Sequence, residues 1–80
     1  MTVGEAVGQR IMQLCQERNI SINKLSGISG DTQSTVNHMV RGRNHSATVS
    51  TIKKLCDGLG ITIDEFFHAD LFAELEQEMK

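Results

Sequence analysis

Apolar residues recur at helical spacing along most of this chain. The first stripe keeps to one helix face and ends in an arginine whose aliphatic stem extends it: Val7, Ile11, Leu14, Cys15 and Arg18. We expect this helix to end at Asn19, because asparagine tolerates the left-handed conformation that closes many helices. Ser21 is a good N-cap for a second, short helix through Leu25 and Ile28. The pattern therefore predicts two consecutive amphipathic helices.

Hydroxyl residues and glycines divide the middle of the chain into two further helices. Gly30 permits the positive φ of a tight turn, and Thr32 is an N-cap for a third helix that ends at Gly42. Three apolar residues lie on one side of this third helix: Val36, Met39 and Val40. A fourth helix is predicted from Thr48 to Gly60, with five residues on its buried face: Val49, Ile52, Leu55, Cys56 and Leu59.

The last part of the chain predicts a fifth helix and a tail. Thr62 and Glu65 have the spacing of a capping box, which starts a helix carrying Phe66 and Phe67. We therefore predict an all-α fold with five helices in residues 1–67 and a tail over 68–80. Three tail residues recur at three- and four-residue steps and predict a short sixth helix: Phe72, Leu75 and Met79. Their stripe either forms a dimer contact or folds back onto the protein's own core.

The second and third helices together, over about 21–41, have the mechanical features of a helix-turn-helix. Leu25, Val36 and Met39 are placed to lock the two helices together across the glycine turn. Ser26 is small, as a close approach between helices requires. In a helix-turn-helix the second helix projects into the DNA major groove, so the helix at about 32–41 is the candidate for base contacts.

Five short motifs follow one another in a familiar order: Gly8-x-Arg10-Ile11-x-x-Leu14, Arg18-Asn19-Ile20-Ser21, Gln33-Ser34-Thr35-Val36-Asn37, Gly42-Arg43, and Leu59-Gly60-Ile61-Thr62-Ile63-Asp64-Glu65-Phe66-Phe67. Together they resemble the Cro/CI-type helix-turn-helix family, the lambda repressor-like fold of phage repressors and many small bacterial regulators. The resemblance covers about residues 7–67. It implies a five-helix DNA-binding domain that acts as a transcriptional regulator, typically a repressor, and that binds an inverted-repeat operator as a homodimer.

The resemblance also suggests which residues touch DNA. Glutamine and asparagine pair with adenine edges, whereas serine and histidine are more permissive, so four residues are the candidates for base contact: Gln33, Ser34, Asn37 and His38. Four more are candidates for phosphate contact: Thr32, Arg41, Arg43 and Asn44. The tail residues named above are the candidates for the dimer contact.

The charge distribution favours a nucleic-acid partner more than the net charge of −2 does. Residues 1–63 contain seven Lys or Arg and four Asp or Glu, a net +3, while residues 64–80 contain six acids and one lysine, a net −5. No acid lies between Thr32 and Cys56. Since the local field decides phosphate binding, this distribution is compatible with DNA.

Some residues depart from the family pattern and support a second hypothesis. Asp31 stands where an aliphatic residue is common, and we expect it to act as a helix cap. Ile22 stands where the family often has a phosphate-binding glutamine. With the acidic tail, these departures favour the alternative of a protein-interaction module with the same fold, such as an antitoxin or an adaptor. Lys53 and Lys54 lie opposite the apolar side of their helix and are interpreted as solubilising.

Other classes of function find little support. Cys15 and Cys56 are in phase with apolar neighbours and are interpreted as reduced core thiols, and no residues have metal-ligand spacing. No catalytic constellation or phosphate-cradling glycine loop is present, so we expect neither enzyme activity nor a cofactor. No run of 18 apolar residues could span a membrane, and the first residues lack the layout of a signal peptide. The cytoplasm is therefore the expected location.

Overall fold

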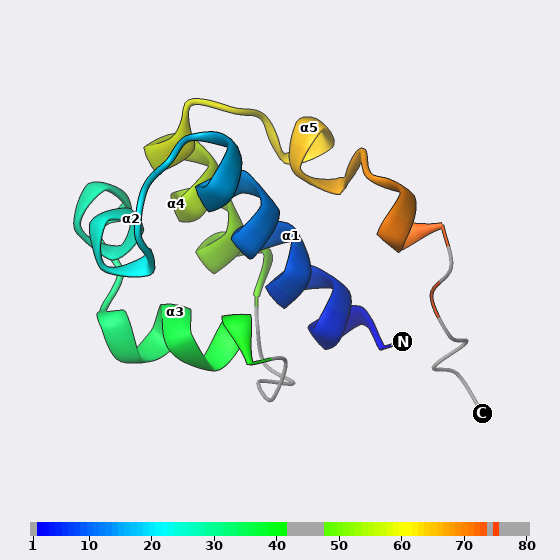
Figure 1. The fold of residues 1–80 in the computed structure, drawn as a ribbon, viewed down its shortest axis with the longest axis horizontal. Helices are drawn as coiled ribbons and strands as arrows, with labels where there is room; N and C mark the ends of the chain where they lie inside the picture. Colours follow the sequence, from blue (N-terminus) through cyan, green and yellow to red (C-terminus); the bar gives the residue numbers. More distant parts are fainter. Residues whose placement is uncertain (1, 42–47, 74, 76–80) are drawn as a thin grey trace.

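The computed structural model describes residues 2–41, 48–73 and 75. This part of the chain forms five α-helices and a 3-10 turn, arranged as in Figure 1: α1 (Val3–Glu17), α2 (Ile22–Ser29), α3 (Gln33–Val40), α4 (Val49–Leu59), α5 (Ile63–Phe67) and η1 (Asp70–Phe72). Within these ranges there is no β-strand. The predicted all-α fold with five helices is confirmed.

Local side-chain chemistry defines both ends of α1. The Thr2 hydroxyl accepts a hydrogen bond from the Glu5 amide at 3.2 Å, and the Glu5 carboxylate accepts one from the Thr2 amide at 3.1 Å, which together form a capping box. The Thr2 amide and the Thr2 hydroxyl both donate to the Glu5 carboxylate, and these two bonds hold the pKa of Glu5 below its ordinary value. At the other end Asn19 has a φ of 55°, and the Ile20 amide donates to the Cys15 carbonyl at 3.0 Å. The chain therefore leaves α1 at the asparagine that the sequence indicated.

The turn between α2 and α3 forms at the predicted residues. Ser21 caps α2 by accepting from the Lys24 amide at 3.0 Å, and α2 ends at Gly30, whose φ of 78° is left-handed. Thr32 then caps α3 by accepting from the Thr35 amide at 3.2 Å. Because the glycine takes this conformation at little cost, the two helices are joined by only three residues, 30–32.

The predicted buried face of α4 is correct except at its first residue. Thr48 caps the helix, Gly60 ends it with a φ of 73°, and four of the five predicted core residues are buried: Ile52, Leu55, Cys56 and Leu59. Val49, in contrast, is 66% exposed, so its predicted burial is wrong. It continues the apolar stripe, but the first turn of α4 extends beyond the part of the helix that its neighbours cover. A stripe of apolar residues identifies the buried face of a helix. It does not show how many turns of that face pack against other helices.

One continuous core joins all five helices. Its members are Val7, Ile11, Leu14, Cys15, Leu25, Val36, Met39, Ile52, Leu55, Cys56, Leu59 and Phe66. Helix α1 packs against α3, while α2 packs against both α3 and α4, so that α3 is held from two sides (Figure 1). The orientation of α3 therefore depends on its contacts with α1 and α2.

Two glycines allow the helices to approach closely. A Cβ atom at Gly8 in α1 would lie 2.5 Å from the carbonyl oxygen of Val40 and 2.6 Å from that of Met39, at the end of α3. A Cβ atom at Gly58 in α4 would lie 3.1 Å from Cα of Ser29 at the end of α2. Both contacts are with backbone atoms, which move less easily than a side-chain tip. Gly8 therefore fixes how close α1 and α3 can be.

After α5 the described part of the tail forms a 3-10 turn, and most of the predicted short sixth helix lies outside the described residues. Phe72, in η1, packs against the core, and its ring centroid lies 4.9 Å from that of Phe67 and 6.2 Å from that of Phe66. Phe67 itself is 36% exposed. Of the two alternatives for the tail stripe, Phe72 follows the one in which it folds back onto the protein's own core. Leu75 is half-buried, and Met79 lies outside the described residues.

The two glycine environments make a matched stability test. Gly8→Ala should lower the free energy of unfolding by about 1–3 kcal/mol, because the methyl group would overlap the backbone of α3. Gly27→Ala, in α2, should instead raise it by about 0.5–1 kcal/mol, since alanine favours the helix and its Cβ meets nothing within 4 Å. Urea unfolding followed by circular dichroism measures both. Equal effects of the two substitutions would contradict the close approach at Gly8.

Candidate nucleic-acid interface

Helix α3 has one buried face and one polar face. Val36 and Met39 are 0% and 1% exposed and anchor the helix in the core. Of the four residues proposed for base contact, Gln33, Ser34 and His38 are exposed and Asn37 is half-buried. The polar residues therefore lie on a surface whose position is fixed by the buried side of the same helix.

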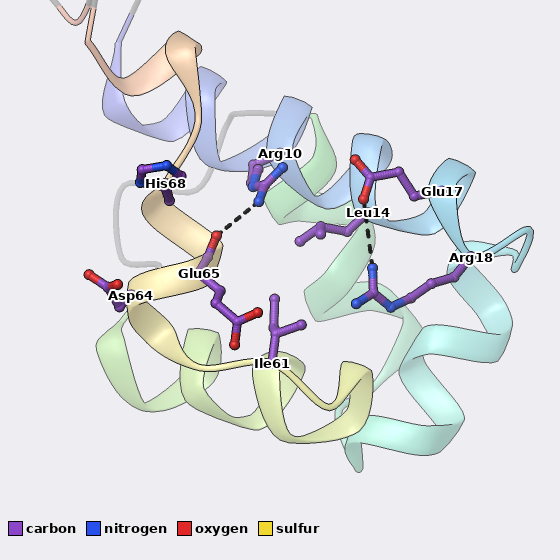
Figure 2. Close-up of a pocket in the computed structure, with 8 residues that line it drawn as sticks. All are labelled: Arg10, Leu14, Glu17, Arg18, Ile61, Asp64, Glu65 and His68. Atoms are coloured by element: carbon purple, nitrogen blue, oxygen red, sulfur yellow. Dashed lines mark hydrogen bonds and ion pairs between the residues drawn. The ribbon is translucent and has the colours of Figure 1, made fainter.

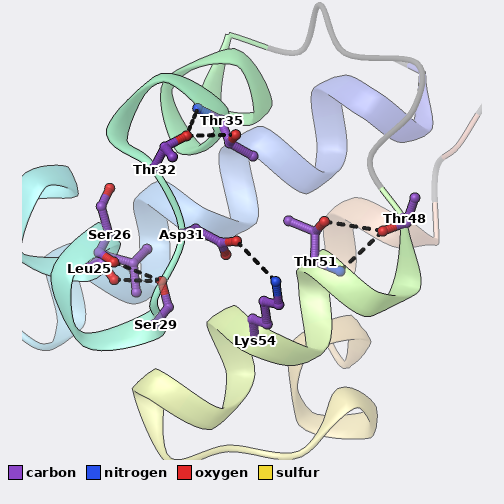
Figure 3. Close-up of polar contacts among 9 residues, drawn as sticks. All are labelled: Leu25, Ser26, Ser29, Asp31, Thr32, Thr35, Thr48, Thr51 and Lys54. Atoms are coloured by element: carbon purple, nitrogen blue, oxygen red, sulfur yellow. Dashed lines mark hydrogen bonds and ion pairs between the residues drawn. The ribbon is translucent and has the colours of Figure 1, made fainter.

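The N-terminus of α3 is open to an anion. Thr32 is exposed, its hydroxyl caps the Thr35 amide, and the Thr32 and Thr35 hydroxyl oxygens are 2.8 Å apart (Figure 3). The amides of Gln33 and Ser34 have no acceptor within the helix, as helix geometry requires. Such amides and the positive end of the helix dipole favour phosphate groups. Thr32 thus lies where a phosphate-contacting residue is expected.

The remaining phosphate candidates are only partly described. Arg41 follows α3 directly and is exposed. Arg43 and Asn44 lie outside the described residues. At the start of α4, Thr48 accepts a hydrogen bond from the Thr51 amide at 3.1 Å, and the two hydroxyl oxygens are 3.1 Å apart, which repeats the arrangement at α3 (Figure 3).

Asp31 does not act as a helix cap, which corrects the sequence-based prediction. Thr32 is the cap of α3, and the Asp31 side chain points instead toward α4 (Figure 3). This side chain is 9% exposed, and its Oδ1 lies 4.0 Å from Nζ of Lys54. Its other oxygen, Oδ2, is buried and accepts no hydrogen bond from the described residues. Lys54 is therefore more than a solubilising residue, because its ammonium faces a buried carboxylate.

Lys53, the neighbour of Lys54, has a different environment. Its ammonium forms an ion pair with Asp57 one turn further along α4, and both side chains are more than half exposed. This pair raises the pKa of Lys53. The interpretation of Lys53 as a solubilising residue agrees with this exposed position. The two consecutive lysines therefore face different partners.

A concave surface lies between α1 and α5, and none of the residues that line it belongs to α3 (Figure 2). It is an open groove of about 440 Å³, lined by Arg10, Leu14, Glu17, Arg18, Ile61, Asp64, Glu65 and His68. Arg10 donates to the carbonyl oxygens of Phe66 at 2.7 Å and Glu65 at 2.9 Å, and so ties α5 to α1. No local sequence pattern indicates this role of Arg10, because the acceptors are backbone atoms more than 50 residues away.

The thiols and the charged groups show no sign of metal chemistry in the described part of the chain. Cys15 and Cys56 are free and buried, as predicted, and burial raises the pKa of both thiols. A raised pKa lowers the fraction of reactive thiolate. Among the described residues, no three His, Cys, Asp or Glu side chains are grouped to hold a metal ion.

None of the described helices is long and apolar enough to cross a membrane.

A family model described as a Cro/C1-type HTH DNA-binding domain matches residues 10–70, about three quarters of the chain. The chain belongs to the Cro/C1-type helix-turn-helix family. The resemblance noted in the sequence is confirmed, and the matched range includes α2 and α3. The Cro/C1-type assignment makes the protein a DNA-binding domain.

Solved structures agree with the Cro/C1-type fold. The prophage Lp1 protein 11 is 39% identical in sequence and matches with a TM-score of 0.80, covering 92% of this chain and 97% of that one. An HTH_3 family transcriptional regulator from Vibrio cholerae matches with a TM-score of 0.78 at 22% identity and supports the fold alone. This second match covers 85% of the present chain and 38% of the regulator, which is a longer protein. No curated protein matches the sequence significantly.

Proposed function

We propose that this protein is a sequence-specific transcriptional regulator that places α3 in the DNA major groove. The observation that carries the proposal is the division of α3 into a fully buried face at Val36 and Met39 and an exposed polar face. A helix held this way can present its polar side to a groove without losing its packing. An α-helix fits the width of the B-DNA major groove, where each base pair has a distinct pattern of donors and acceptors.

The residues of α3 divide into two roles under this proposal. Gln33 and Ser34 lie in its first turn and contact base edges, with Asn37 and His38 one turn later on the same side. Thr32 and Arg41, at the two ends of α3, contact the sugar–phosphate backbone, together with Arg43 and Asn44 beyond the described residues. The amide groups at the start of α3 add to the phosphate contacts.

We further propose that the protein acts as a cytoplasmic homodimeric repressor on an inverted-repeat operator. Two copies related by a two-fold axis would place two α3 helices in successive major grooves about 34 Å apart. Occupying a promoter in this way excludes other proteins from the same DNA, which is sufficient for repression. The dimer candidates are Leu75, Met79 and Phe72. Phe72 contributes only the part of its side chain that the core of the same protomer leaves exposed.

An interaction module such as an antitoxin or an adaptor remains the competing proposal. One observation is compatible with it: Val49, at the start of α4, is 66% exposed although it continues the core stripe. A single residue is far smaller than a protein interface. The DNA-binding proposal therefore has the stronger support, and the experiments below distinguish the two.

Selection from a random duplex library with the purified protein, at two salt concentrations, tests the proposed function. We expect an inverted repeat to be enriched and to remain enriched at the higher salt, because base contacts depend less on counterion release than phosphate contacts do. Binding that is absent, or that lacks sequence preference and disappears with salt, would favour the interaction module.

Substitutions at the first turn and at the end of α3 should separate base contacts from phosphate contacts. Gln33→Ala should weaken binding to the selected site by about 1–3 kcal/mol and relax the preference at one base position. Arg41→Ala should weaken binding to all duplexes alike. It should also make the dependence of log affinity on log salt concentration less steep, by about 0.9 in slope. Titration of selected and scrambled duplexes measures both. An equal loss on both duplexes for Gln33→Ala would refute its role in base contact.

Shortening the chain tests the dimer contact. A chain ending at Ala73 keeps Phe72 on the core and removes Leu75 and Met79, so we expect a folded monomer where the full chain is a dimer. Sedimentation equilibrium measures the mass, and circular dichroism verifies that the helices persist. A dimer of unchanged affinity in the shortened chain would exclude these two residues from the interface.

A further inference from the structure

The Asp31 carboxylate occupies an unusual position for a protein that binds a polyanion. It lies in the three-residue turn between α2 and α3, directly before the cap of α3. Its side chain is only 9% exposed, and Oδ2 accepts no hydrogen bond from the described residues. Burying a charge that is incompletely paired costs free energy, so the carboxylate does not gain its position by stabilising the fold.

The counter-charge of Asp31, the ammonium of Lys54, is loosely held. Nζ of Lys54 lies 4.0 Å from Oδ1, beyond the range of a well-formed charge-assisted hydrogen bond, and the Lys54 side chain is 58% exposed. The ammonium is thus free to move in solvent, whereas the carboxylate is held by the turn. Figure 3 shows the pair between the capped N-termini of α3 and α4.

The carboxylate is close to the proposed path of the DNA backbone. Asp31 and Thr32 are consecutive, so their side-chain oxygens are less than about 10 Å apart whatever their rotamers. The Debye length at physiological salt is about 8 Å, and a buried charge is screened less than an exposed one. A phosphate at Thr32 would therefore experience the charge of Asp31.

We propose that Asp31 is an electrostatic attenuator of DNA binding, a buried carboxylate that lowers the affinity for every duplex, with Lys54 as the opposing charge. The inference rests on the proposed function, because it requires the N-terminus of α3 to face phosphate groups. Its effect is independent of sequence, since it acts on the backbone and touches no base. A lower affinity for every duplex would shorten each stay on DNA without changing the preference between sequences.

The sign of the effect separates this role from a structural one. If Asp31 and Lys54 only held α3 in place, removing either would weaken DNA binding. If they act through their charges, Asp31→Asn should bind an arbitrary duplex about three- to tenfold more tightly. Lys54→Met should bind it more weakly, by a smaller factor, because its ammonium is largely in solvent and is screened. The affinity of the double variant should lie between those of the two single variants.

Asp57 and Lys53 provide matched controls on the same helix. Asp57→Asn makes the same change in net charge at an exposed position one turn beyond Lys53. We expect it to change the affinity by less than about twofold, because solvent and salt screen it. Lys53→Met is the control for Lys54→Met.

The experiment is a titration of a 20-base-pair duplex of arbitrary sequence at several salt concentrations, with urea unfolding of each variant in parallel. Tighter binding by Asp31→Asn, with a salt slope steeper by at most about 0.9, would support the proposal. Weaker binding by Asp31→Asn, or an equal gain with Asp57→Asn, would overturn it while leaving the proposed function intact. If the unchanged protein binds no duplex at any salt concentration, the proposed function fails and the attenuator role fails with it.

Discussion

The structure depends above all on the burial of one side of α3. A helix of eight residues is unstable alone in water, because helix nucleation is unfavourable in free energy and so short a helix forms few backbone hydrogen bonds to offset it. Val36 and Met39 supply the missing stability by entering the core, and Gly8 lets the backbone of α1 come close enough to cover them. Because the buried side of α3 is fixed in the core, the direction in which its polar side faces is fixed as well. The exposure of the polar side of α3 therefore depends on this packing.

The predictions that succeeded rest on short-range rules. Ser21, Thr32, Thr48 and Thr62 were expected to start helices, and each accepts a hydrogen bond from an amide three residues later. Asn19 and the glycine that closes α2 were expected to take left-handed conformations, and both do. These features need only a few neighbouring residues, so the sequence contains all the information required. Most of the core could also be predicted from the sequence, because the apolar residues of each helix lie on one face.

The features that sequence reasoning missed all depend on distant parts of the chain. Arg10 reaches backbone carbonyls of α5, which any residue there would supply, so no side-chain pattern indicates the contact. The exposure of Val49 depends on how far the neighbouring helices extend, and the orientation of Asp31 depends on where α4 lies. For the candidate site, its location on α3 could be predicted. The role of each polar residue could not, since exposure is common to all surface residues and the partner decides which of them matter.

The two lysines of α4 show how position, more than residue type, determines electrostatic function. Lys53 pairs with an exposed acid on its own helix, and such a pair contributes little in solvent. Lys54 faces a carboxylate that the turn between α2 and α3 keeps out of water, where charges interact over longer distances. Adjacent residues of the same type therefore differ in whether their charge can reach the surface of α3. It follows that the net charge of a small DNA-binding domain is a poor guide to its affinity. Under the proposed binding mode, the charges that matter most are those fixed close to the phosphates, and the Asp31 carboxylate, held in the turn before α3, is one of them.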